Sequence, residues 1–173
     1  MNIINGDRMK KIMLVLIICV VIITGCSLNN TPNSKVEELL GKYQGLDNSI
    51  SISSYPITKR EDLDDDIENK YRELIKKQYR NLSYEIKDDK IDGDNAVITT
   101  EISVLDYKTV IEKYRSKNSD TVKAYDNDLI DDLSKVNKRI VYTIDFNVSK
   151  NNKGEWKVST LTTDMENKLL GIY

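Results

Sequence analysis

Cys26 is the residue whose surroundings most clearly indicate chemistry. It follows an apolar run from Ile12 to Ile23 that begins directly after Lys10 and Lys11, and the chain turns polar immediately after it. A basic start, a short apolar middle and small residues before a processing point are typical of a secretory signal peptide. As a helix the run of about 12 residues would measure roughly 18 Å, too short for the hydrocarbon core of a bilayer at about 30 Å. The pattern therefore predicts a cleaved export segment and a thiol at the new amino terminus.

The end of this segment, Ile23-Thr24-Gly25-Cys26, resembles the processing box of bacterial lipoproteins: a branched aliphatic residue, a small residue, Gly and Cys. The resemblance implies that the Cys26 thiol receives a diacylglyceryl group through a thioether, and that the lipoprotein signal peptidase cuts before it. Two acyl chains hold a protein stably at a membrane, whereas one does so only marginally. We therefore expect a lipid-anchored protein on the outer face of the cytoplasmic membrane. The alternative is an unmodified Cys26, after an ordinary signal peptide or within a short anchor helix.

The composition excludes several kinds of catalytic site. The chain has no His, Cys19 leaves with the signal peptide, and Cys26 is used for lipid. These facts exclude Ser-His-Asp and Cys-His nucleophile systems, the common His/Cys zinc sites and a disulfide within the mature chain. No Gly-rich phosphate-binding loop is present either. We accordingly expect no catalytic residues of these kinds and no cofactor.

The charge of the chain disfavours a nucleic-acid partner. The 26 basic and 28 acidic residues become 23 and 27 once the signal peptide, with three basic residues and one acidic residue, is removed. A net charge near −4 does not suit a polyanionic ligand. Acidic clusters at 61–66, 88–94 and 126–132 suggest calcium, but none has the ligand spacing of an EF-hand loop. We interpret them as solvated helix faces and turns, and expect no metal site.

Two amphipathic helices are expected in the first half of the exported chain. The first begins near Thr31-Pro32, where Thr caps the helix and Pro occupies its first turn, Ser34 and Glu37 offer a second capping box, and Gly45 marks the end. After a loop over 47–57, a second helix runs from a cap at Thr58 to about Arg80. The inner faces have apolar residues at helical spacing: Val36, Leu39, Leu40, Tyr43 and Leu46 in the first helix, and Leu63, Ile67, Tyr71, Leu74, Ile75 and Gln78 or Tyr79 in the second.

The apolar period then changes to two, which predicts β-strands. The alternating segments are residues 82–87, 96–104, 140–148 and 156–161. Asp92-Gly93 and the residues before Gly154 mark two hairpin turns. A helical stretch over 107–136, interrupted near Ser116–Asp120, connects the hairpins, and Asp164 caps a last short helix that ends at Gly171.

This order of elements predicts an α+β fold. A curved antiparallel sheet of about four strands would pack against two N-terminal helices and a central helical insertion, because each hairpin must bury one face. The arrangement resembles the cystatin-like and NTF2-like cone folds in element order and size, although the split insertion at 107–136 departs from their commonest form.

Four segments of the mature chain resemble a family of small uncharacterised lipoproteins of Gram-positive bacteria. They are Lys76–Ile86, Asp92–Ala96, Val141–Phe146 and Leu170–Tyr173. The likeness covers most of the mature chain and implies export and a single domain, but it supplies no activity or catalytic residue. We divide the chain into a signal peptide (1–25), a lipidated Cys with a short tether (26–33) and one globular domain (34–173).

Tyr84 and Tyr142 are the candidate pocket residues of this domain, because both are expected on the concave side of the sheet. A carboxylate with a raised pKa beside a Tyr would suit proton transfer next to a carbonyl group. By alternation, however, Asp145 should point away from Tyr142. The simpler interpretation is that the tyrosine rings pack inward and keep their hydroxyls at the wet rim.

We therefore expect a non-catalytic binding module for a protein, peptide or small ligand. The alternatives are a small-molecule enzyme of the cone-fold kind that uses Tyr and a carboxylate, and a structural component of the envelope. Ile130 lies outside the predicted apolar face of its helix and is a candidate contact for a partner. The interruption at Ser116–Asp120 is a candidate recognition loop.

Overall fold

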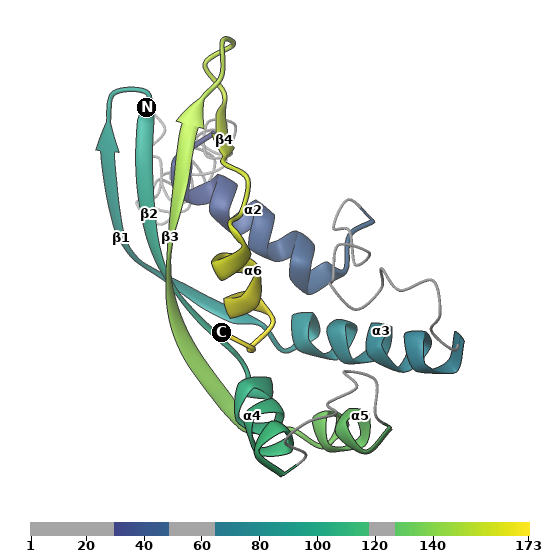
Figure 1. Cartoon of the computed structure of the whole chain (residues 1–173). Helices are drawn as coiled ribbons and strands as arrows, with labels where there is room; N and C mark the ends of the chain where they lie inside the picture. Colours follow the sequence, from purple (N-terminus) through teal and green to yellow (C-terminus); the bar gives the residue numbers. More distant parts are fainter. Residues whose placement is uncertain (1–29, 49–64, 118–126) are drawn as a thin grey trace, which may run out of the picture.

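Helices and strands follow one another in the predicted order. The computed structural model describes residues 30–48, 65–117 and 127–173. Their elements are α2 (Pro32–Gly45), α3 (Asp65–Arg80), β1 (Ser83–Asp92), β2 (Asn95–Leu105), α4 (Tyr107–Lys117), α5 (Asn127–Ser134), β3 (Arg139–Lys150), β4 (Trp156–Val158) and α6 (Thr163–Leu169). The strands form one antiparallel sheet in the order β1-β2-β3-β4. It curves along its length, with α2 and α6 on one face, which confirms the α+β prediction (Figure 1).

The alternation of the strands determines which face of the sheet is buried. The core residues of the two central strands are Ala96, Ile98, Thr100, Ile102 and Val104 in β2, and Ile144, Phe146 and Val148 in β3. Val36 and Leu40 of α2 and Leu169 of α6 pack onto them in a first core. The opposite face is polar: Thr99 donates a hydrogen bond to Asp145 across the strands at 2.7 Å. One face therefore needs helices over it, and the other does not.

The start of α2 confirms the predicted cap at Thr31. The backbone N–H of Ser34 donates to the Thr31 hydroxyl at 3.1 Å, and the backbone N–H of Thr31 donates to the Ser34 hydroxyl at 3.0 Å. The helix ends at Gly45 as expected, but the left-handed residue is Leu46, with a φ of 55°. Leu46 adopts this conformation while its side chain packs against the first core. The predicted cap at Thr58 and Leu63 lie outside the described residues.

β1 is longer than predicted. The charged run after Ile86 was expected to be a turn, but β1 pairs with β2 as far as Asp92, across a bulge at Lys87. Backbone hydrogen bonds define the strand here, and an edge strand does not need a buried face. The bulge places Asp89 and Ile91 opposite the core residues of β2. The turn is Gly93-Asp94, in which Gly93 has a φ of 57°. β4, by contrast, is shorter than predicted.

α5 contributes to a second hydrophobic core, in which one residue lies differently from its predicted position. It lies between α3 and α4, and buries Leu129, Ile130 and Leu133 together with Tyr71 and Leu74 of α3. Ile130 is only 3% exposed. The prediction that Ile130 contacts a partner is therefore wrong, because it assumed one packing face and this helix packs on two sides.

The cap of the last helix is also corrected. Thr162, not Asp164, caps α6, and its hydroxyl accepts from the backbone N–H of Met165 at 3.3 Å. Asp164 is exposed in the first turn, where its charge still favours the helix dipole. Gly171 ends the helix as predicted, with a φ of 68°.

A buried polar contact joins the two cores. The side-chain amide of Gln78 in α3 donates to the carbonyl of Leu105 at 3.0 Å, and its oxygen accepts from the Leu105 N–H at 2.9 Å. Gly171 lies against the contact between Gln78 and Leu105. A Cβ atom on Gly171 would overlap the Leu105 carbonyl and the Gln78 side-chain amide. The Gly171 carbonyl also accepts from the N–H of Lys108 at 2.7 Å. This contact, which we call the joint, sets where β2 ends and α4 begins.

Candidate functional site

The residues predicted for lipid attachment are not covered by the structure. Cys26 and the recognition residues Ile23, Thr24 and Gly25 lie outside the described residues. In the part of the chain that the structure describes, no helix is long and apolar enough to cross a membrane. Within the same ranges, no group of three or more His, Cys, Asp and Glu residues is placed to hold a metal ion.

Tyr84 and Tyr142 share one face of the sheet, as predicted. Each pairs with Ile102, from opposite sides, and both rings pack half-buried against the first core. The Tyr142 hydroxyl donates to a main-chain oxygen of Tyr173 at 3.1 Å, and the two rings meet edge to face with their centres 5.9 Å apart. Neither tyrosine lines any of the three pockets described below. The packing agrees with the interpretation of inward rings.

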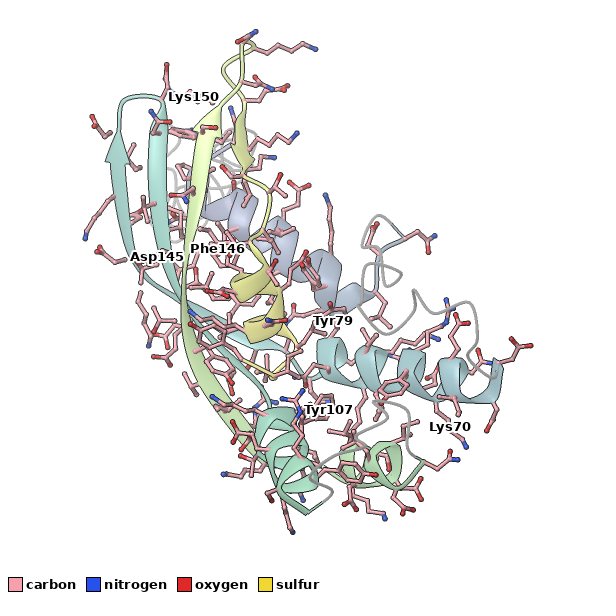
Figure 2. The ribbon with its side chains drawn as sticks, in the orientation of Figure 1. Lys70, Tyr79, Tyr107, Asp145, Phe146 and Lys150 are labelled. Atoms are coloured by element: carbon pink, nitrogen blue, oxygen red, sulfur yellow. The ribbon has the colours of Figure 1, made fainter. Side chains whose placement is uncertain are left out.

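The pKa of each phenol is raised above its ordinary value. Burial raises the pKa of Tyr84, as does the charge of Glu37. Burial also raises the pKa of Tyr142, with further effects from Asp106 and Glu112. Asp145 lies on the opposite side of β3 from Phe146 (Figure 2), and no Asp or Glu side chain of the described residues hydrogen-bonds to either hydroxyl. Both tyrosine rings pack against the first core.

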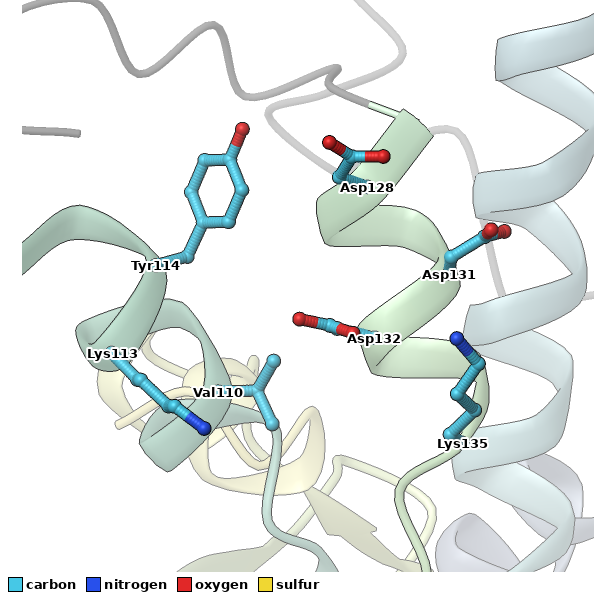
Figure 3. Close-up of a pocket in the computed structure, with 7 residues that line it drawn as sticks. All are labelled: Val110, Lys113, Tyr114, Asp128, Asp131, Asp132 and Lys135. Carbon is cyan, nitrogen blue, oxygen red and sulfur yellow. The ribbon is translucent and has the colours of Figure 1, made fainter. Parts of the chain in front are cut away.

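A groove lies between α4 and α5. Its larger part has a volume of about 390 Å³ and is lined by Val110, Lys113, Tyr114, Asp128, Asp131, Asp132 and Lys135. A second part of about 300 Å³ continues from the shared residues Val110, Lys113, Asp132 and Lys135 toward Lys138. Val110 and Asp132 extend into the gap from opposite helices (Figure 3). We call both parts together the α4–α5 groove.

The α4–α5 groove presents both signs of charge beside apolar surface. Lys113 and Lys135 line the same pocket as Asp128, Asp131 and Asp132, and of the three acids Asp132 points toward α4 (Figure 3). Such an arrangement can form hydrogen bonds and ion pairs with a ligand that itself carries an amine and a carboxylate. The sequence shows these residues as ordinary polar positions of two helices. It contains no signal for the gap, which depends on how the helices pack.

Asp106 fixes the α4 side of the groove. It is 3% exposed, and its carboxylate accepts from the backbone N–H of Thr109 at 3.1 Å, from the Thr109 hydroxyl at 2.8 Å and from Lys138 Nζ at 3.2 Å. Burial alone would raise the pKa of Asp106, but the hydrogen bonds from Thr109 and Lys138 outweigh it and lower the pKa. An Asp three residues before a Thr at a helix start is a capping pattern. The caps predicted from the sequence did not include Asp106.

A third pocket lies at the other end of the sheet. It has a volume of about 430 Å³ and is lined by Asn30, Lys35, Asn151, Glu155, Trp156 and Lys157. Lys150 Nζ lies 4.9 Å from the centre of the Trp156 ring. This pocket adjoins the point where the described chain begins.

Comparison with known proteins gives one distant likeness. No protein-family model matches the chain, and no curated protein is significantly similar to it. Among solved structures, it is similar to the "putative lipoprotein (ycdA)" of Bacillus subtilis, with 18% identity and a TM-score of 0.40. The match covers 82% of this chain but 46% of the other, so this chain spans about half the length of that protein. At this score the likeness assigns neither family nor function.

Proposed function

We propose that the chain is an exported lipoprotein whose folded domain is held at the outer face of the cytoplasmic membrane by acyl chains on Cys26. The observation that carries this proposal is the segment from Lys10 to Cys26, with its basic start, short apolar run and Ile23-Thr24-Gly25-Cys26 ending. Two acyl chains supply enough buried methylene groups for stable anchoring. A fold that begins only a few residues after Cys26 supports the same proposal, since the anchor then connects directly to the domain.

Fatty-acid labelling in a Gram-positive host tests the anchor. The wild-type chain should incorporate labelled palmitate and, by intact mass, should lack residues 1–25. Cys26→Ala should incorporate none and keep its signal peptide, because the thiol is the acceptor. Cys19→Ala is the matched control, since it removes a thiol from the same segment and should behave as wild type. Labelling of Cys26→Ala at the wild-type level would disprove the assignment.

We further propose that the domain binds a partner through the α4–α5 groove. The groove combines Lys113 and Lys135 with Asp131 and Asp132, and Tyr114 adds an aromatic surface. This mixture suits a peptide or a small polar ligand that carries both charges better than it suits an apolar ligand. No observation in the described residues favours the catalytic alternative, because the Tyr142 hydroxyl is bound to a main-chain oxygen of Tyr173 and Asp145 accepts from Thr99 on the other face of the sheet.

Photocrosslinking in intact cells tests the groove. A photoreactive amino acid at Lys113 should give a defined adduct, whereas the same group at the exposed Asn147 on the other face of the sheet should give none. Adding Lys135→Glu, which reverses one charge of the groove, should abolish the adduct. An adduct of equal yield from both positions, or one that is insensitive to Lys135→Glu, would exclude the groove as the binding site.

A further inference from the structure

Asn30 attaches the start of the domain to one end of the sheet. Its side-chain oxygen accepts a hydrogen bond from the backbone N–H of Trp156 at 2.9 Å, and its amide donates to the carbonyl of Gly154 at 3.3 Å. Gly154 lies in the connection between β3 and β4, and Trp156 is the first residue of β4. The point where the chain enters the domain is therefore fixed at this connection.

The β1–β2 turn lies at the same end of the molecule. Lys150 donates from its backbone N–H to the Asp94 carbonyl and from Nζ to the Asp94 carboxylate, both at 2.9 Å. Asn33, at the start of α2, donates to Asp89 of β1 at 3.0 Å. Residues 30–35, 89–95 and 149–157 thus form one end, which we call the hairpin end. In Figure 1 it lies opposite α4 and α5.

The chain between the lipid and the hairpin end is very short. Four residues lead from Cys26 to Asn30, a distance of at most about 14 Å at 3.6 Å per residue. β3 runs from beside α5 to the hairpin end, and its 12 residues span up to about 36 Å at about 3.3 Å per residue. The lipid therefore reaches the hairpin end and does not reach the α4–α5 groove.

Two features of the hairpin end suit a lipid surface. Ile91 is 57% exposed, and the bulge in β1 gives it that position. Lys153 and Lys157 lie exposed in and just after the β3–β4 turn, where they can contact anionic headgroups. Both ends carry both signs of charge, since the hairpin end also has Asp92 and Glu155 and the groove also has Lys113 and Lys135. The orientation of the domain therefore follows from the short link to Cys26 and the exposed Ile91 rather than from net charge.

We propose that the hairpin end is the face that lies on the membrane, with Ile91 and Lys153 nearest the lipid, and that the α4–α5 groove points away from it. This inference rests on the proposed lipid anchor at Cys26. It adds an orientation: the acyl chains, Asn30 and the two hairpin turns lie on one side, and the partner site lies on the other. The groove is then presented outward, beyond the layer of headgroups.

Site-directed labelling of the full lipidated chain tests this orientation. The protein is reconstituted in vesicles of phosphatidylcholine and phosphatidylglycerol that contain a lipid with a nitroxide on its headgroup. In a processed chain Cys19 is gone and the Cys26 thiol is acylated, so an introduced cysteine is the only site for a maleimide dye. The variants are Ile91→Cys and Lys153→Cys at the hairpin end, with Lys113→Cys in the groove as the matched control, because Lys113 and Lys153 are both exposed lysines.

The parent chain separates the two proposals. If Cys26 is acylated, the parent chain takes up no dye; dye on Cys26 would disprove the anchor and the orientation with it. With an unlabelled parent, we expect the nitroxide to quench dyes at Ile91→Cys and Lys153→Cys several-fold more strongly than the dye at Lys113→Cys. Equal quenching at all three positions, or stronger quenching at Lys113→Cys, would overturn the orientation while leaving the anchor intact.

Discussion

Gly171 shows how a single residue controls the joint between the two cores. Its positive φ of 68° and its contact with the Leu105 carbonyl and the Gln78 amide both exclude a side chain. The neighbouring Leu169 and Leu170 are buried, so the segment cannot move away without exposing them. Gly154 also has a positive φ, of 76°, but open space surrounds its Cβ position.

Substitution by Ala should therefore be more costly at Gly171 than at Gly154. Gly154→Ala should lower the free energy of unfolding by about 1 kcal/mol, the cost of a left-handed alanine. Gly171→Ala should lower it by on the order of 3 kcal/mol or more, because overlap with a backbone carbonyl is added. Urea unfolding of both variants measures the difference. Equal losses would show that no close approach exists at Gly171.

Tyr107 gives a prediction about pH. Its ring is buried, its hydroxyl donates to the Leu74 carbonyl at 3.2 Å, and burial raises its pKa to about 12. The folded state holds the phenol neutral, so its stabilising effect is complete below the unfolded pKa of about 10 and is lost as the pH rises toward 12. Between these values, the wild-type chain should lose up to about 2 to 3 kcal/mol relative to Tyr107→Phe.

Denaturant titrations from pH 9 to 12 provide the measurement. At neutral pH, Tyr107→Phe should itself be less stable by about 1 kcal/mol, because one hydrogen bond is lost. Parallel curves for Tyr107→Phe and wild type across the alkaline range would contradict the prediction.

Among the elements, α2 depends on its first turn. The reciprocal bonds between Thr31 and Ser34 satisfy backbone donors that have no partner within the helix. Thr31→Ala should therefore destabilise the protein by about 1 kcal/mol, whereas Thr31→Ser keeps a hydroxyl and should be near wild type. Thermal unfolding followed by circular dichroism compares them. If the Ser and Ala variants were equally destabilised, the hydroxyl would not be the stabilising group.

The sequence predicts elements best where one face is buried. The alternation from Ala96 to Val104 and the apolar face of α2 predicted the buried residues correctly, because each of these elements packs against a single core. The burial of Ile130 was not predicted, because α5 packs on two sides. The second half of β1 was missed because backbone pairing forms an edge strand without apolar alternation. The α4–α5 groove depends on the spacing of two helices, which no local pattern encodes.

At the scale of the whole molecule, the joint should make the two cores unfold together. Leu133 belongs to the second core, and Trp156, the only tryptophan of the chain, belongs to the first. Leu133→Ala should cost about 2 to 5 kcal/mol. Because Gln78 and Leu105 connect the cores, the fluorescence transition of Trp156 should shift by the same amount as the far-ultraviolet signal of the helices.

Trp156 fluorescence and far-ultraviolet circular dichroism, followed in one urea titration, compare the unfolding of the two cores. A Trp156 midpoint that stays at its wild-type value, while the helical signal is lost earlier, would show that the cores are independent. Leu40→Ala, in the first core, is the reciprocal variant and should also shift both signals together.

The bulged edge strand has a consequence for a protein crowded on a two-dimensional surface. Copies held at one height and in one orientation would bring their open sheet edges level with one another, a favourable arrangement for strand-to-strand polymerisation. β1 breaks its ladder at Lys87 and continues through Asp88-Asp89-Lys90, so most of its outer half is charged. Neighbouring copies would therefore meet an irregular, charged border, and the population can stay dispersed at high density.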